Sequence, residues 1–221
     1  MTIDDETLSS ESQAVMKNYA VACQKEFWQE VLKVETAYLI QHLEDMREIL
    51  SVGCGPAIIE GELAQRGFRI TGLDVSREAL NSAPDRVRTI AARMEDVSLP
   101  ESSFDAVIYV ASLQFIEDYR KALEKTFTVL RPGGRLILML LNPDSAFIKK
   151  KLRDPDSYVC KIRHTDLQEI EKAVAARFVV KAEYFMGVRA EELFVSQDPN
   201  WAVLYIITGT KPDGLEGDQE Q

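Results

Sequence analysis

The chain contains 221 residues, with 26 Lys and Arg against 36 Asp and Glu, which gives a formal net charge of −10. Hydrophobic residues make up 46% and charged residues 28%. This balance is typical of one soluble globular domain and excludes disorder of the whole chain. The acidity also argues against a nucleic-acid partner, because the phosphates would repel it.

No segment approaches the roughly 18 consecutive apolar residues that a membrane-spanning helix needs. The acidic first twelve residues lack the basic and apolar regions of a signal peptide. The cysteines Cys23, Cys54 and Cys160 lie far apart and form no Cys-x-x-Cys pair, which disfavours a disulfide framework or a structural zinc site. We therefore expect a cytoplasmic protein without membrane insertion.

The negative charge is concentrated at the two ends of the chain. Residues 1–13 hold four acidic residues and no basic one, and residues 210–221 hold four acidic residues and one lysine. Without these contributions of −4 and −3, the rest of the chain carries only −3. The charge argument against nucleic acid is therefore weak, and the lack of a recognition motif becomes the main reason to expect no such partner.

The N-terminal part divides into a tail and a helical cap. Residues 1–12 are polar and acidic, and we expect them to form a disordered tail. From Gln13 to about Leu43, apolar residues recur at helical spacing. This pattern predicts two helices, or one helix broken near Gln24, which form an N-terminal helical cap over residues 13–44.

Short apolar runs alternate with helical segments from residue 46 onward, a pattern typical of parallel strands joined by helices. The predicted strands are 48–52, 68–73, 89–92, 104–110, 136–141, 178–184 and 202–207. The predicted helices are 58–66, 77–81, 118–130 and 165–176. We expect an α/β fold with a doubly wound, mostly parallel seven-stranded sheet, helices on both faces and an antiparallel C-terminal edge hairpin. Residues 210–221 have the composition of a disordered tail.

Two glycines and an aspartate follow the first two predicted strands. Gly53 and Gly55 follow the first strand and allow the backbone to turn tightly and approach a ligand, since neither has a Cβ. The next helix offers free N–H groups to whatever lies there. Asp74 closes the second strand, 21 residues after Gly53. It could accept two hydrogen bonds from a ribose diol, or it could simply form a turn before a helix.

Two nucleotide-binding fingerprints are missing from the sequence. A dinucleotide fingerprint requires a third glycine at position 58, which is Ile58, and no Walker sequence is present. The loop is therefore not expected to hold a pyrophosphate or a triphosphate, and nicotinamide-dependent oxidoreduction is disfavoured. Cys54 is either a reactive thiol at a helix N-terminus or a small side chain packed against the sheet, and we prefer the second interpretation.

Three motifs in order carry a resemblance to a known family. They are Ile49–Leu73 with Asp74, Leu99–Val107 (LPESSFDAV) and Val129–Leu136 (VLRPGGRL). Together they resemble the class I S-adenosylmethionine-dependent methyltransferases, and most of all the small-molecule, type 11 branch that includes ubiquinone and sterol methyltransferases. The resemblance covers roughly residues 46–140 and implies a Rossmann-like methyltransferase fold.

The resemblance also implies that different segments of a single domain, residues 13–209, have different functions. Residues 46–141 would form the cofactor-binding core, and residues 142–163, a polar segment without a clear pattern, would form a lid on the substrate side. The glycine loop would lie under the methionine part of the cofactor, Asp74 would hold the ribose hydroxyls, and residues 92–96 would flank the adenine. The implied cofactor-binding residues are Ser51, Gly53, Cys54, Gly55, Asp74, Val75, Met94, Glu95, Val110 and Gln114.

Three positions depart from the family pattern. Ser51 stands where the family usually has an acidic residue that helps to neutralise the methionine ammonium, and Ala57 replaces a third glycine. Arg93 stands where an aspartate usually bonds the adenine amino group. The adenine contact would then fall to Glu95, or to backbone atoms with Met94 packed on the ring.

Methyl transfer from a sulfonium requires mainly alignment and exclusion of water, and a general base only where the acceptor must lose a proton. The candidates for such a role are Tyr19, Tyr109, Gln114 and Asn142, each of which also has a structural interpretation. The two histidines, His42 and His164, have no partner at metal-ligand spacing, so no metal is expected.

We therefore expect an enzyme that transfers a methyl group from S-adenosyl-L-methionine to a small-molecule acceptor by in-line displacement and releases S-adenosyl-L-homocysteine. The alternative is a non-catalytic protein that holds this cofactor, or acts as a partner protein, on a methyltransferase fold. The sequence leaves open the acceptor, its reacting atom and the oligomeric state.

Overall fold

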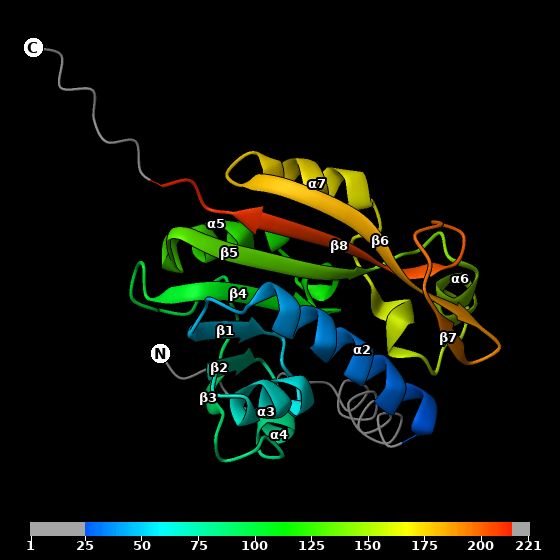
Figure 1. Ribbon diagram of the computed structural model, residues 1–221, viewed down its shortest axis with the longest axis horizontal. Helices are drawn as coiled ribbons and strands as arrows, with labels where there is room; N and C mark the ends of the chain where they lie inside the picture. The colour runs from blue at the N-terminus through cyan, green and yellow to red at the C-terminus, as the bar shows by residue number, and fades with distance from the viewer. Residues whose placement is uncertain (1–24, 214–221) are drawn as a thin grey trace, which may run out of the picture.

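The computed structural model describes residues 25–213. A single eight-stranded sheet in the order β3-β2-β1-β4-β5-β8-β6-β7 forms its centre (Figure 1). The strands are β1 (Glu48–Val52), β2 (Arg69–Asp74), β3 (Arg88–Ala91), β4 (Phe104–Val110), β5 (Leu130–Leu141), β6 (Val179–Arg189), β7 (Glu192–Phe194) and β8 (Ala202–Thr210). Neighbours among β1 to β5 run parallel, whereas β8 lies antiparallel between β5 and β6. The predicted α/β architecture is confirmed.

Helices cover both faces of the sheet because its strands are apolar on both sides. Ile108 of β4 and Ile137 of β5 belong to the core under α2 (Glu26–His42) and α3 (Ile58–Gln65). The next residues, Tyr109 and Leu138, belong to the core under α5 (Tyr119–Val129) and α7 (Leu167–Ala175). The two-residue period of a strand thus serves two separate hydrophobic layers.

Side chains at the helix starts explain several boundaries. The side chain of Ser76 accepts a hydrogen bond from the amide of Ala79 and caps α4 (Arg77–Leu80). Asp118 and Asp166 cap α5 and α7 in the same way.

Two features of the C-terminal part correct the sequence prediction. The sheet has eight strands instead of seven, because β6 folds back at Ala190 and Glu191 and pairs with the short β7. The chain remains ordered past residue 210: Thr210 pairs with Arg135, and the Lys211 ammonium donates to the carbonyls of Phe127 and Leu130 over 2.7 Å each. The C-terminal tail predicted from residue 210 therefore begins too early.

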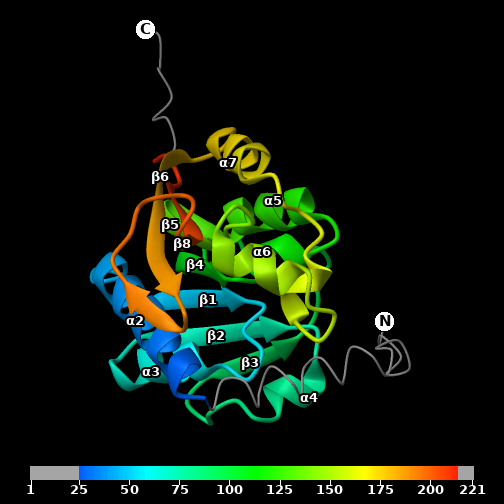
Figure 2. The same cartoon turned by 90° about the vertical axis from the view of Figure 1, so that its right-hand side faces the viewer.

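The predicted lid, residues 142–163, is described in full, whereas the predicted N-terminal tail and cap are described only from residue 25 onward. Residues 142–163 contain α6 (Ala146–Leu152) and the 3-10 helix η2 (Tyr158–Lys161). Viewed from the carboxyl ends of the parallel strands, this segment crosses the end of the sheet (Figure 2). Within the predicted cap 13–44 the described helix is α2, and the tail 1–12 and residues 13–24 lie outside the described residues.

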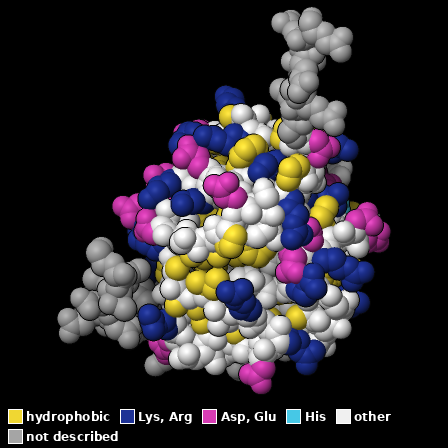
Figure 3. Space-filling model, turned by 90° about the vertical axis from the view of Figure 1, so that its left-hand side faces the viewer, with side chains coloured by type: hydrophobic (Ala, Val, Ile, Leu, Met, Phe, Trp, Pro, Cys, Tyr) yellow, Lys and Arg dark blue, Asp and Glu magenta, His cyan; other side chains and the backbone are white. Residues whose placement is uncertain are grey.

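The amino ends of the parallel strands form the opposite side of the molecule. There the Asp105 carboxylate accepts hydrogen bonds from the amides of Arg47 and Glu48, at 2.9 and 2.8 Å, and pairs with Arg131. Acidic and basic side chains are interspersed on this side (Figure 3). Within residues 25–213, no helix is both long enough and apolar enough to cross a membrane.

Candidate functional site

A cavity of about 370 Å³ lies at the carboxyl ends of β1, β2 and β4. Strand order reverses here, because β1 continues to β2 on one side and lies next to β4 on the other. Ligands of open α/β sheets bind at such a switch point. The volume is that of a typical small-molecule site.

The loop after β1 forms the floor of the cavity. Gly53 and Gly55 both have positive φ, at +74° and +53°. A Cβ on Gly53 would lie 2.5 Å from the Cβ of Ser112, whereas a Cβ on Gly55 would meet no atom within 4 Å. Gly53 is therefore required for close packing, and Gly55 leaves open space over the loop.

Ser112 connects this loop to the end of β4. Its hydroxyl donates a 2.6 Å hydrogen bond to the carbonyl of Val52, the last residue of β1. Ala111, the residue before Ser112, has φ +46°, so the chain turns sharply as β4 ends. The two sides of the switch point are thereby held together before any ligand arrives.

Asp74 is buried at the end of β2 and lines the cavity. Its carboxylate accepts hydrogen bonds from the amides of Gly55 and Ser76, each at 2.8 Å. Burial raises the pKa of Asp74, and hydrogen bonds from the amides of Ser76, Gly55 and Val75 oppose that rise. Each carboxylate oxygen can accept a further bond, so the group can still receive a pair of hydroxyls.

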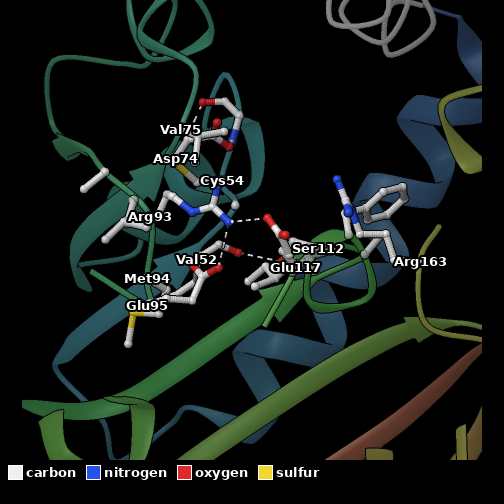
Figure 4. Close-up of a pocket in the computed structure, with 18 of the residues that line it drawn as sticks. Val52, Cys54, Asp74, Val75, Arg93, Met94, Glu95, Ser112, Glu117 and Arg163 are labelled. Carbon is white, nitrogen blue, oxygen red and sulfur yellow. Dashed lines mark hydrogen bonds and ion pairs between the residues drawn. The ribbon is translucent and has the colours of Figure 1, made fainter. Parts of the chain in front are cut away.

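The cavity beyond Asp74 combines an apolar wall with an ion-paired one (Figure 4). Val75 is 54% exposed although its side chain is apolar, a surface that a flat apolar group would cover. Arg93 donates to the carboxylates of Glu95 and Glu117, at 3.2 Å each. Arg93 thus connects the segment after β3 with the one that follows β4.

At the opposite end, the segment after β5 closes the cavity. Tyr158, Lys161 and Arg163 reach it from η2 and the residues that follow. The ring of Tyr158 lies 5.8 Å from that of Phe115, centroid to centroid. Lys161 and Arg163 form no ion pair within the described part of the chain.

Three of the four candidate catalytic residues have structural contacts and do not line the cavity. The Tyr109 hydroxyl is fully buried and lies 2.7 Å from the hydroxyl of Thr126, and burial raises its pKa. The Gln114 amide donates to the carbonyls of Leu141 and His164. Asn142 donates to the carbonyls of Pro199, before β8, and of Ala202, the first residue of β8. The fourth candidate, Tyr19, lies outside the described residues.

The side chains of Cys54, His42 and His164 all make contacts within the fold. The Cys54 sulfur packs against Gly72, where a Cβ would lie 2.7 Å from it, and burial raises the pKa of the thiol. His42 stacks on Tyr38 at 3.9 Å, and His164 bonds the carbonyl of Ile116. Across residues 25–213, no group of His, Cys, Asp or Glu has the arrangement of a metal site.

Ser51 does not line the cavity but holds a buried acid beside it. Its hydroxyl donates a 2.6 Å hydrogen bond to the carboxylate of Glu60, from the first turn of α3. Burial raises the pKa of Glu60 to about 7. Glu35, on α2, is buried close by, and its pKa rises to about 8 through burial and repulsion by Glu60.

The structure brings together all the expected cofactor-binding residues except Ser51 and Gln114. Those that line the cavity are Gly53, Cys54, Gly55, Asp74, Val75, Met94, Glu95 and Val110. Sequence reasoning did not single out Ile116, Glu117, Tyr158, Lys161 or Arg163. The last three lie in the segment that was expected only as a whole to act as a lid.

Residues 50–138 match the family model described as "Methyltransferase domain". Among curated proteins, the chain is 34% identical over 96 residues to the uncharacterized methyltransferase Mb0092 of Mycobacterium bovis, covering 41% of this chain and 49% of that protein. It is 30% identical over 123 residues to a ubiquinone biosynthesis O-methyltransferase of Alkalilimnicola ehrlichii, covering 51% and 45%. The match thus spans about half the length of these relatives.

Solved structures share the fold over a longer stretch. A SAM-dependent methyltransferase of Thermotoga maritima, described as a possible histamine N-methyltransferase, superposes with a TM-score of 0.69 at 17% identity, over 90% of this chain and 98% of that one. The plantazolicin methyltransferase BpumL, solved with SAH, gives 0.69 at 18%, over 92% of both chains. The [4+2]-cyclase SpnF gives 0.67 at 18%, over 86% of both. At these identities the likeness shows the fold alone.

Proposed function

We propose that this class I S-adenosylmethionine-dependent methyltransferase domain transfers a methyl group from its cofactor to a small molecule. The observation that carries the proposal is the buried Asp74 carboxylate, which faces the same cavity as the open glycine loop. The methyltransferase domain is identified by the comparisons with known proteins, and the class of acceptor is inferred from the residues that line the cavity.

The residues of the cavity fit the cofactor. Gly55 leaves open space over the loop for the methionine part, and Asp74 has remaining acceptor capacity for the two ribose hydroxyls. The exposed side chain of Val75 offers an apolar surface to the adenine. When bound, the cofactor supplies an electrophilic sulfonium methyl group that needs no further activation.

The protein's own contribution is to align the acceptor and exclude water. Ser112 fixes the loop relative to the end of β4. The segment 142–163, which we propose as the acceptor-side lid, closes the cavity opposite Asp74 with Tyr158, Lys161 and Arg163. Holding the acceptor close to the methyl group is the main catalytic effect such an arrangement provides.

We propose an acceptor with a flat apolar body and an acidic group. The rings of Phe115 and Tyr158 support the first feature. Lys161 and Arg163 support the second, because the other charged cavity residues already have partners: Glu95 and Glu117 pair with Arg93, and Asp74 is held by amides.

Calorimetric titration with S-adenosyl-L-homocysteine tests the cofactor assignment. We expect saturable binding by the folded chain, and no detectable heat at millimolar ligand would overturn the assignment. Methyl-labelled S-adenosylmethionine incubated with fractionated cell extract then tests catalysis. If S-adenosyl-L-homocysteine binds but no labelled methyl group is transferred, the protein holds the cofactor without catalysis, which is the alternative function.

A further inference from the structure

Two buried carboxylates, those of Glu60 and Glu35, form no ion pair with any residue of the described range 25–213. Glu60 is 3% exposed and Glu35 is 6% exposed. Every ion pair among the described residues involves other carboxylates. A buried carboxylate without a counter-charge is unfavourable, and it either takes up a proton or binds a cation.

Glu60 faces an internal space as well as the Ser51 hydroxyl. A small cavity of about 30 Å³ is lined by Leu32, Gly53, Cys54, Pro56, Ile58, Ile59, Glu60 and Val110. Gly53, Cys54 and Val110 also line the main cavity, so the two spaces adjoin at the loop. The small cavity has room for about one water-sized group.

The charge and hydrogen-bonding capacity of Glu60 indicate which kind of group would bind in the small cavity. Ser51 occupies one oxygen of Glu60, which leaves acceptor capacity on a carboxylate that lines the cavity. An ammonium group is of water size, carries three donors and a positive charge, and would neutralise the buried acid. The methionine end of the proposed cofactor carries such a group.

We propose that Glu60 supplies the negative charge that binds the cofactor's ammonium group, with Ser51 orienting the carboxylate. The inference rests on the proposed function. It explains how an uncharged Ser51 at the end of β1 is compatible with cofactor binding, because the charge comes from the first turn of α3 instead of from the strand.

The test compares two ligands that differ at the amino-acid end. S-adenosyl-L-homocysteine carries the ammonium group, whereas 5′-methylthioadenosine keeps the nucleoside and lacks that end. We expect Glu60→Gln to weaken binding of the first by about tenfold or more, since a charge-assisted hydrogen bond is lost, and to leave binding of the second unchanged. The double variant Ser51→Asp with Glu60→Ser, which returns the charge to the strand, should recover most of the loss.

Proton release provides a second readout that a purely structural role would not produce. A bound cation favours the ionised form of Glu60, so binding of the homocysteine ligand near pH 6.5 should release a proton, measured by calorimetry in buffers of different ionisation enthalpy. Glu60→Gln should abolish the release. The groups that surround Glu60 are Glu35 of α2, Ser51 of β1, Cys54 of the loop and Asp74 of β2, and Glu35→Gln is the matched control that should retain the release.

Equal weakening of both ligands by Glu60→Gln, or no weakening of either, would overturn the inference while leaving the cofactor assignment intact. Failure of the wild-type chain to bind S-adenosyl-L-homocysteine would instead overturn the cofactor assignment, and this inference with it.

Discussion

The backbone amide of Gly55 donates a 2.8 Å hydrogen bond to the carboxylate of Asp74, and this bond joins the glycine loop after β1 to the end of β2. The amide of Ser76 donates to the other oxygen. Two elements separated by helix α3 therefore share one buried charge. The site is organised in advance of binding, and its loop and its acidic group should respond together to mutation.

Asp74→Asn should weaken binding of S-adenosyl-L-homocysteine by about tenfold to a hundredfold and destabilise the fold by about 1–3 kcal/mol. An amide side chain places an N–H₂ group against the donor of Gly55 or of Ser76, so one buried amide loses its acceptor. Calorimetric titration and urea denaturation measure the two effects. Asp85→Asn, in an exposed loop, is the matched control and should change neither. Unchanged ligand affinity in Asp74→Asn would rule out the proposed role of Asp74.

Gly53→Ala should be far more damaging than Gly67→Ala, although both glycines have positive φ, at +74° and +94°. Alanine at Gly67 meets no atom within 4 Å and incurs only the left-handed backbone cost of about 1–2 kcal/mol. Alanine at Gly53 adds a contact of 2.5 Å with Ser112, which requires a backbone shift. Denaturation should show the larger loss for Gly53→Ala, and only this variant should lose cofactor binding. Equal losses would show that the contact with Ser112 is not restrictive.

The spacing of hydrophobic residues, together with the residues that form turns, predicted most of the fold. The alternation in β4 and β5, where neighbouring residues such as Ile108 and Tyr109 belong to opposite layers, is a local pattern that a sequence displays directly. The reversal between β6 and β7 could not be predicted in this way. It depends on positive φ at Ala190 and Glu191, and neither residue is a glycine that would indicate such a turn in the sequence. The early tail boundary has a similar cause: Lys211 is ordered by carbonyls more than 80 residues away.

The same distinction applies to the site. Glycines after a strand and an acid after the next strand are close in sequence to the elements that position them, so Gly53, Gly55 and Asp74 could be predicted. The pairing of Ser51 with Glu60 requires the packing of α3 on β1. Gln114 and Asn142 have polar side chains near strand exits, and only the fold shows that backbone carbonyls use their amide donors.

Glu35→Gln should stabilise the protein at alkaline pH. The folded pKa of Glu35 is raised from 4.5 to about 8, so folding favours the protonated form. That contribution is fully present below about pH 4.5 and is lost as the pH rises through about 8. Wild-type stability should therefore fall between pH 5 and 8.5 relative to the variant, by on the order of 1–3 kcal/mol. Urea denaturation of both proteins at the two pH values measures this difference, and parallel pH profiles would contradict it.

Tyr109→Phe should reduce stability and leave methyl transfer per folded molecule unchanged. The variant removes a buried hydrogen bond to Thr126, at a cost of about 1 kcal/mol. Thr126 still donates to the carbonyl of Ala122, which limits the damage. Urea denaturation and the turnover of labelled cofactor by folded protein separate the two quantities. A large drop in turnover without a matching loss of folded protein would restore Tyr109 as a catalytic candidate.

Lys161 and Arg163 should select acceptors by charge. Three ring compounds that differ only in their substituent provide the probes: 4-hydroxybenzoate, its methyl ester and 4-hydroxybenzylamine, titrated by calorimetry in the presence of saturating S-adenosyl-L-homocysteine. Because both cations are exposed, each should contribute only about two- to fivefold to the preference for the carboxylate. Lys161→Glu with Arg163→Glu should reverse the order in favour of the amine, whereas Lys150→Glu, on α6 and away from the cavity lining, should not. Equal affinities for the three compounds in the wild-type chain would contradict an acidic acceptor while leaving the cofactor site unaffected.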